Sequence, residues 1–135
     1  MLRFIGRIGL GGALLFAGIG HFVNAEAFRA QVPLWMPAPE AVIAISGVME
    51  IVLAAALIFA PQRYRAAVGW ITAAFFVAIF PGNISQFLTG TDAFGLDSDA
   101  ARFVRLLFQP VLVVWALWCT SAWVQWRESR RTTAT

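Results

Sequence analysis

One acidic residue, Glu50, lies near the centre of an apolar run over residues 41–60. An ionised carboxylate at the middle of a bilayer costs at least about 3 kcal/mol unless it is paired, protonated or hydrated. Ser46 precedes Glu50 by four residues and Gly47 precedes it by three, so the three share one face of a helix. Glu50 is therefore the candidate catalytic residue, as a proton donor or acceptor, and Ser46 is a candidate ligand-binding residue.

Four more polar residues are expected at the same membrane depth as Glu50 or nearer the surface on the same side. Arg105 and Gln109 are four residues apart, so they share a helix face, and we expect them to be the direct partners of Glu50. His21 and Asn83 are expected nearer the mouth of the site. The predicted ligand-binding residues are therefore His21, Ser46, Asn83, Arg105 and Gln109. The other half of the apolar segments contains almost nothing polar.

Two prolines favour an open space beside these polar residues. Pro81 and Pro110 each lack a backbone donor, and each ring clashes with the carbonyl four residues earlier, so both are expected to kink their helices. Carbonyls that are freed at membrane depth must be satisfied by neighbours, water or a ligand. We therefore expect a cavity between kinked helices.

The same residues also have a purely structural interpretation. A Glu50 carboxylate paired with Arg105 or hydrogen-bonded by Gln109 would lock two helices together. Arg105 would alternatively extend its charge to the membrane surface. Asn83 and Ser46 would then join helices, with a contribution of about 0.6 kcal/mol each.

The elements that must position these residues are long apolar segments. The chain has 135 residues, of which 60% are hydrophobic, far above the ~45–50% apolar usage of soluble domains. Four segments reach the ~20 residues that a helix needs to cross a bilayer, and they cover residues 4–23, 41–60, 66–87 and 103–123. We predict an all-α integral membrane four-helix bundle over residues 1–126, followed by a polar tail over residues 127–135.

The basic residues predict the orientation of this bundle. All ten are arginines, and seven of them lie near the N-terminus, in the second connection or after the fourth segment. Because cytoplasmic connections carry an excess of Arg and Lys, both termini and the tail are predicted to be cytoplasmic. Trp70, Trp123 and Trp126 fall at the predicted inner ends, where interfacial tryptophans are enriched.

The first segment also has a second interpretation, as a secretory signal peptide. Arg3 and Arg7, the apolar stretch and the small residues near position 25 imitate such a signal and its cleavage site. The stretch is long for a signal peptide and ends in two glycines and His21, which favours a retained membrane helix.

The residue types limit which cofactors and partners the protein can have. A single cysteine, Cys119, excludes a disulfide within the chain and is interpreted as a packing residue. With one histidine and no cysteine pair, we expect no metal or haem site, and the chain carries no flavin motif. The arginines flank apolar segments, so membrane lipids rather than nucleic acid are the expected partners. The sequence leaves the oligomeric state open, with a homo-oligomer among the alternatives.

The first connection, residues 24–40, contains three prolines and is expected to be irregular or partly helical chain along the outer interface. Phe28, Trp35 and Met36 either anchor this connection in the head-group region or make it a lid over the site.

The other two connections are simpler. Residues 61–65 form a tight link, which predicts that the second and third segments are antiparallel neighbours. Residues 88–102 carry three aspartates and predict an acidic surface loop.

Several short motifs occur in one order between residues 10 and 120. They are Gly18-Ile19-Gly20-His21-Phe22, Val32-Pro33-Leu34-Trp35-Met36-Pro37, Ser46-Gly47-Val48-Met49-Glu50, Phe80-Pro81-Gly82-Asn83, and Arg105 with Gln109-Pro110 and Trp115. On these motifs the chain resembles the DoxX-like family of small four-helix bacterial membrane proteins. Two departures are Gly82, where that family commonly has alanine, and Leu106-Leu107, where it has a Leu-Pro pair.

This resemblance implies a bacterial inner-membrane location. It also implies a role as a membrane subunit beside a redox partner, as for the relatives that accompany thiosulfate:quinone oxidoreductase. The chain has no autonomous catalytic motif, so it is expected to be at most an oxidoreductase subunit. The first functional hypothesis is an accessory subunit that binds a quinone in the outer half. The alternatives are a module that binds or transports a small lipid-like molecule without chemistry, and a structural membrane adaptor.

Overall fold

The structure is a computed structural model and describes residues 1–133. Over these residues it is helical without strands, which confirms the predicted all-α class. The elements are α1 (Leu2–Val23), α2 (Ala25–Arg29), α3 (Pro39–Phe59), the 3-10 helix η1 (Gln62–Tyr64), α4 (Arg65–Thr89), α5 (Asp99–Cys119) and α6 (Ala122–Thr132). Four of them, α1, α3, α4 with η1, and α5, are long and apolar enough to cross a membrane. These four helices indicate a multi-pass membrane protein.

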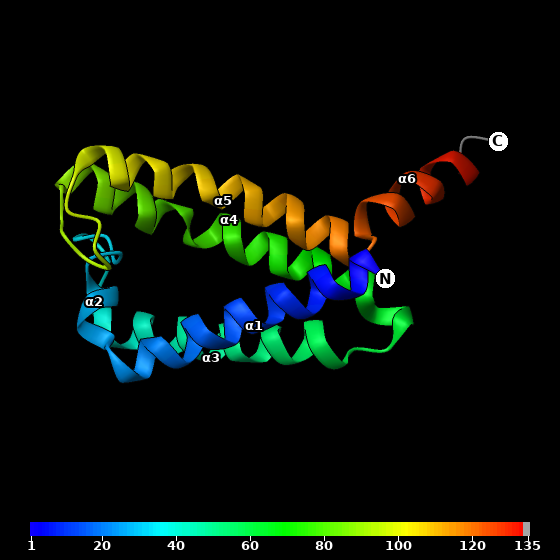
Figure 1. Cartoon of the computed structure of the whole chain (residues 1–135), viewed down its shortest axis with the longest axis horizontal. Helices are drawn as coiled ribbons and strands as arrows, with labels where there is room; N and C mark the ends of the chain where they lie inside the picture. The colour runs from blue at the N-terminus through cyan, green and yellow to red at the C-terminus, as the bar shows by residue number, and fades with distance from the viewer. Residues whose placement is uncertain (134–135) are drawn as a thin grey trace.

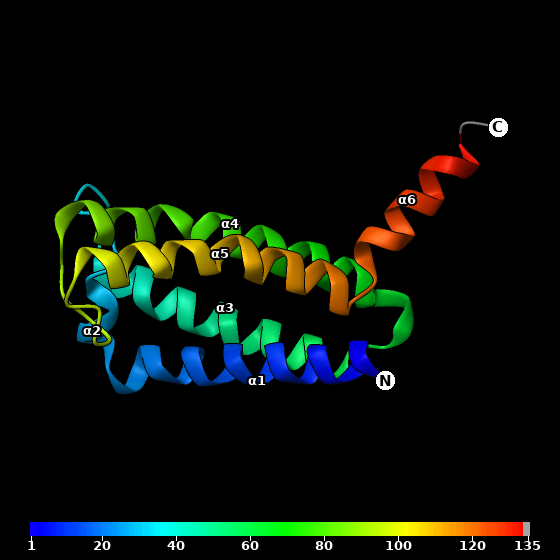
Figure 2. The ribbon, with the colours of Figure 1, turned by 45° about the horizontal axis from the view of Figure 1, so that its top comes forward.

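The long helices form two pairs. α1 packs along α3, and α4 packs along α5, with less extensive contact between the pairs. Figures 1 and 2 both show α4 beside α5 and α1 beside α3. The tight link at η1 makes α3 and α4 antiparallel, as predicted, but they are not each other's main neighbours.

Glycines explain why α3 packs on α1. A Cβ at Gly47 would lie 3.1 Å from the carbonyl oxygen of Gly18, and a Cβ at Gly11 would lie 3.3 Å from that of Ala54. Small residues at these positions let two helix backbones approach closely, which is the main source of helix association in a membrane. The α1–α3 pairing therefore follows from residues without side chains.

The two ends of the molecule differ in what covers them (Figures 1 and 2). The loop end, as we name it, carries α2, residues 30–38 and residues 90–98. The terminal end carries the start of α1, η1 and the start of α6. The hydrophobic core cluster lies toward the terminal end, with Leu10, Leu14, Leu53, Ala54, Leu57, Ala73, Phe75, Phe76, Ala116 and Cys119. The burial of Cys119 there confirms its interpretation as a packing residue.

The fourth membrane helix begins and ends earlier than the predicted range 103–123. Ser98 caps α5, because its hydroxyl accepts a hydrogen bond of 3.1 Å from the Ala101 amide. The helix ends at Cys119, and Ser121 adopts a left-handed backbone with φ 61° before α6 begins. The break places Trp123 and Trp126 in a separate helix that leaves the rest of the molecule (Figure 2).

The polar tail expected over residues 127–135 is helical as far as Thr132, because α6 continues to that residue. Its aromatic residues provide the reason: the Trp126 ring lies 6.5 Å from that of Trp70 and 5.0 Å from that of Trp123, between centroids. Arg130 also lies over the Trp126 ring. Residues 134 and 135 of the expected tail lie outside the described residues.

The connections at the loop end are held by arginines. The first is partly helical, as predicted, and an ion pair of Arg29 with Glu40 joins α2 to the start of α3. The third is irregular only over residues 90–98, because α4 and α5 extend into the range expected to be loop. Arg102 closes this loop with bonds of 2.7 Å to Asp92 and 2.8 Å to Asp99.

Candidate functional site

A cavity of about 530 Å³ lies at the loop end between the two helix pairs. Most of its lining is apolar, and the polar lining residues come from α1, α3, α5 and the first connection. These polar residues are His21, Gln31, Ser46, Glu50 and Arg105. Pro81 and Gly82 of α4 also line it, so the cavity occupies the place where the proline in that helix was expected to open one.

Glu50 and His21 form the most buried polar contact of this cavity. The Nε2 atom of His21 lies 3.2 Å from Oε2 of Glu50, and the residues are only 8% and 6% exposed. The two atoms are at ion-pair distance but not in hydrogen-bond geometry, so Glu50 Oε2 has no hydrogen-bond partner among the described residues. A buried carboxylate oxygen without a donor is costly unless something else satisfies it. This oxygen is the strongest indication of a ligand or water in the cavity.

The expectation that Glu50 pairs directly with Arg105 or Gln109 is wrong. Among the described residues, the ion-pair contact of Glu50 is with His21. The physical reason is helix pairing: α3 packs on α1, while α5 packs on α4. Arg105 lies across the same cavity from α3 rather than against the carboxylate. The sequence identified the residues of the site but misassigned their partners.

Gln109 organises the opposite wall of the cavity. Its Oε1 accepts hydrogen bonds from Arg105 Nη1 at 3.2 Å and from Asn83 Nδ2 at 3.1 Å. Its Nε2 donates to the Phe76 carbonyl at 2.7 Å, one residue before the carbonyl that the ring of Pro81 leaves without a donor. Gln109 and Asn83 do not line the cavity. They lie between α4 and α5, where Gln109 holds the guanidinium of Arg105 and Asn83 donates to Gln109.

Of the remaining predicted residues, Ser46 lines the cavity one helical turn from Glu50. Gln31 was missed: it lines the cavity, and its Nε2 donates to Oε1 of the buried Gln86 at 3.3 Å. Gly82 allows this contact, because a Cβ there would overlap the Gln31 carbonyl. A glycine directly after a helix proline was the available signal for such a close approach.

An aromatic stack covers the loop end of the cavity. The Phe28 ring lies on the His21 ring with 3.7 Å between centroids, and the Phe94 ring meets Phe28 edge-on at 4.8 Å. Phe28, Trp35 and Met36 all line the cavity, which agrees with the lid interpretation of the first connection and not with Phe28 in the head-group region. Phe94, from the third connection, was not predicted.

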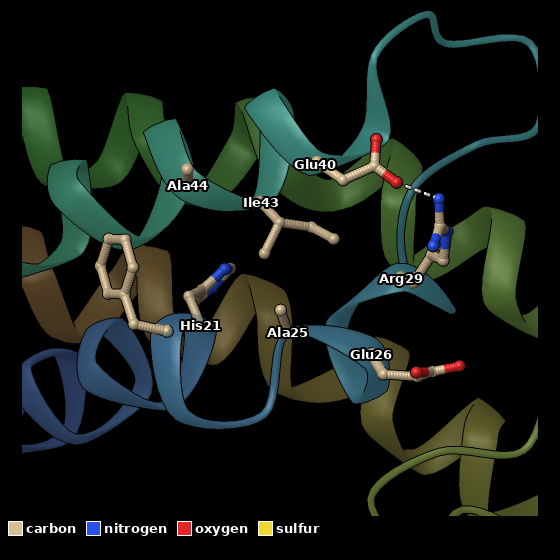
Figure 3. A pocket seen from close by; sticks show the side chains of 8 residues that line it. His21, Ala25, Glu26, Arg29, Glu40, Ile43 and Ala44 are labelled. Atoms are coloured by element: carbon tan, nitrogen blue, oxygen red, sulfur yellow. Dashed lines mark hydrogen bonds and ion pairs between the residues drawn. The ribbon is translucent and has the colours of Figure 1, made fainter.

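A second cavity of about 290 Å³ lies on the other side of His21. Its charged lining residues are Glu26, Arg29 and Glu40, which come from α2 and the start of α3. Figure 3 shows His21 reaching from α1 toward Ile43, with the Arg29–Glu40 ion pair at one side of the cavity. His21 and Ile43 line both cavities. We call the smaller cavity the outer pocket and the larger one the main cavity.

The described residues contain no group of three or more His, Cys, Asp or Glu side chains that could hold a metal ion. What the main cavity offers is an apolar space with an acidic group and a basic group on facing walls. Such a site can bind an amphipathic molecule and exchange a proton with it.

Fold and site together define a helical chain with four membrane-spanning candidates and a mostly apolar cavity that contains a buried carboxylate. Residues 10–120 match the model of a family described as Domain of unknown function (DUF8561). This match covers most of the chain, so the protein belongs to that family. No curated protein and no solved structure matches the sequence.

Proposed function

We propose that this protein is an accessory subunit of a quinone-linked redox complex and binds a quinone in the main cavity. The observation that carries the proposal is Glu50, which lines a mostly apolar cavity and whose buried Oε2 lacks a hydrogen-bond partner. In this role Glu50 donates a proton to a quinone oxygen or accepts one from the quinol hydroxyl. Electrons come from a partner protein.

The size and polarity of the main cavity support this ligand class. Small-molecule sites commonly enclose about 300–1,000 Å³, with an apolar lining and a few placed polar groups, and the main cavity has about 530 Å³. A quinone combines an apolar ring and tail with two carbonyl oxygens. Arg105 and Ser46 can donate hydrogen bonds to one oxygen while the Glu50–His21 pair meets the other.

The proposed setting is the inner membrane of a bacterium, with a four-helix bundle whose termini are cytoplasmic. The arginines support this orientation, because Arg3, Arg63 and Arg65 lie at the terminal end with α6, while the acidic residues gather at the loop end. The main cavity then opens in the extracytoplasmic half. The resemblance to the DoxX-like family supports a role beside a redox partner.

A second candidate is a module that binds or carries a lipid-like molecule without chemistry. The observation that favours it is that Glu50 and Arg105 line one cavity, so their opposite charges compensate each other when no ligand is bound. Any molecule with an apolar body and a zwitterionic or hydroxylated head would suit this arrangement.

Quinone binding tests the proposal, because Trp35 lines the main cavity and reports on it by fluorescence. A short-chain ubiquinone or menaquinone analogue titrated into the full chain in nanodiscs should quench tryptophan emission saturably. Glu50→Gln should weaken this binding at least tenfold, whereas Asp97→Asn, at an exposed position of the third connection, should leave it unchanged. Saturable binding of phospholipid but not quinone would support the carrier. Equal binding by wild type and Glu50→Gln would refute the redox role.

A further inference from the structure

We infer that His21 connects Glu50 to the aqueous phase at the loop end, so that protons reach the buried carboxylate through the outer pocket. The inference deepens the proposed function and rests on it in one respect, the role of Glu50 as a proton site. It adds a pathway, a side of the membrane and a second residue that handles the proton.

The position of His21 between two cavities is the first argument. It lines both the main cavity and the outer pocket. Its Nε2 is 3.2 Å from Glu50 Oε2, while its Nδ1 is buried and has no partner among the described residues. An imidazole can carry a proton on either nitrogen. The nitrogen that does not face Glu50 is therefore left without a partner beside the outer pocket, and a small movement of the ring exposes it to water there.

The outer pocket suits water. At about 290 Å³ it has ample room for several molecules, and a buried water needs about two to four polar partners. The side chains of Glu26, Arg29 and Glu40 supply such partners around the space shown in Figure 3. These three side chains are also largely solvent-exposed, so the pocket leads to the surface.

The opposite direction is closed. On the terminal-end side of Glu50, α3 contributes Leu53, Ala54 and Leu57 to the hydrophobic cluster, and α1 contributes Leu10 and Leu14. Each of these side chains is at most 5% exposed. Apolar side chains offer no group that can pass a proton. Access from the terminal end would have to cross this cluster.

The charged groups that face His21 can be named for each element around it. Glu50 and Glu40 come from α3, Glu26 and Arg29 from α2, and Arg105 from α5 across the main cavity. In the proposed step, the His21 ring first turns so that its Nε2–H points at Glu50 Oε2, which lies 3.2 Å away. A hydronium ion in the outer pocket then gives a proton to Nδ1 and becomes water, while Nε2 releases its own proton to Oε2. One proton moves inward and leaves the imidazole protonated on Nδ1, and proton exchange with water returns it to the Nε2–H tautomer. The reverse sequence releases a proton from Glu50 to the outside.

The test measures the protonation of Glu50 from each side of a membrane. The full chain is reconstituted in sealed vesicles, and the carboxyl band of protonated Glu50 is followed by infrared spectroscopy after a pH jump on one side. Loss of the band in Glu50→Gln assigns it. The side that carries the loop end is identified with an impermeant maleimide and Asp97→Cys in a Cys119→Ala background. We expect the band to respond to the pH at the loop end and not to that at the terminal end.

Two variants sharpen the result. His21→Gln should slow the response at least tenfold, and Ile19→Leu, at an exposed position of α1 that lines neither cavity, should leave it unchanged. If His21→Gln does not fold, wild type suffices, because His21 is the single histidine of the chain and nitrogen NMR distinguishes its two ring nitrogens, of which we follow the Nδ1 signal. That signal should also change only with the pH at the loop end.

A Glu50 band that follows the pH at the terminal end, or that responds equally fast in His21→Gln, would overturn the inference. So would a band that follows neither side. The failure would be distinct from that of the proposed function: quinone binding that depends on Glu50 would remain. Conversely, access through His21 without quinone binding would leave the pathway intact and refute the quinone role.

Discussion

The two ends of the molecule treat buried polar groups in opposite ways. At the terminal end the arginine side chain of Arg7, only 4% exposed, donates to the Leu57 carbonyl at 2.6 Å. At the loop end Arg105 lines a cavity and donates to a glutamine side chain. Arg7 satisfies carbonyls at the end of α3, whereas Arg105 is held beside the main cavity. This contrast separates polar residues that stabilise the fold from those available to a ligand.

The chemistry of Arg7 explains why it is structural. The Leu57 carbonyl would normally accept a hydrogen bond from the amide of residue 61, but that residue is Pro61 and has no N–H. The last carbonyls of a helix need partners when they are buried. The Arg7 guanidinium is this partner for the Leu57 carbonyl, and it also donates to the Ile58 carbonyl at 3.3 Å.

The loop end leaves polar atoms without partners. Glu50 Oε2, His21 Nδ1 and Asn83 Oδ1 are buried and make no hydrogen bond among the described residues. At the terminal end, Thr72 Oγ1 is in the same condition, but its surroundings are packed side chains. Glu50 and His21 line the main cavity, so their unpartnered atoms lie beside a space that a ligand or water can fill, whereas Asn83 lies between α4 and α5.

The largest effect should follow from separating α1 and α3. Gly47→Leu places a side chain against the His21 Cβ and the Gly18 carbonyl, and overpacking of this kind costs about 3 kcal/mol. The measurement is the free energy of unfolding in mixed micelles. Gly12→Leu is the matched control on α1, because a Cβ at Gly12 meets nothing within 4 Å. Equal destabilisation by both variants would contradict the α1–α3 pairing.

Arg7→Met should destabilise the protein by about 2 kcal/mol, because one buried and one partly buried carbonyl lose a charged donor. Quinone binding per folded molecule should not change. Arg105→Met should do the reverse: binding should weaken about tenfold with a smaller loss of stability. Unfolding titrations measure the loss of stability in each variant, and fluorescence titrations measure the loss of quinone binding. If both variants lost binding alike, the contrast between the two ends would fail.

Gln109→Leu should destabilise the protein by about 1 kcal/mol, since it removes the acceptor for Asn83 and the donor to the Phe76 carbonyl. It should also weaken quinone binding, because Arg105 loses the group that holds it. The double variant Gln109→Leu with Arg105→Met tests this coupling. Its binding loss should equal that of Arg105→Met alone, and strictly additive losses would show that Gln109 acts on the ligand directly.

The smallest effect is expected at the aromatic stack. Phe94→Ala removes the edge contact with Phe28 and should cost about 0.5 kcal/mol of stability. The same change loosens the cover of the main cavity, so the ligand dissociation rate should rise a few-fold. Stopped-flow fluorescence measures that rate, with Phe103→Ala as a control outside both cavities. An unchanged dissociation rate would remove the lid role of the stack.

Much of the fold followed from the sequence because it depends on local patterns. Apolar length and proline content predicted four long helices and a partly helical first connection. The end of the fourth helix was misplaced because the left-handed residue there is Ser121, a type that does not mark such a position. The order of apolar residues likewise could not predict that α6 would form around tryptophan contacts.

The sequence predicted which residues belong to the site but not which of them contact one another. Polar residues in apolar segments pointed to Glu50, Ser46 and Arg105, which line the main cavity. Which residue meets Glu50 depends on helix packing, and that packing is decided by close contacts at Gly18 and Gly47. The sequence showed these glycines without showing which helices they join.

The most direct test of the central claim is the ligand content of the purified protein. The claim is that the main cavity holds one small amphipathic molecule, so mass spectrometry of the extracted full chain should find about one quinone-like molecule per wild-type protein. Ala17 lines the main cavity, and Ala13 lies on the same helix outside it. Ala17→Trp should therefore abolish the bound molecule, and Ala13→Trp should retain it. Retention in Ala17→Trp, or no bound molecule in any of the three proteins, would contradict the account.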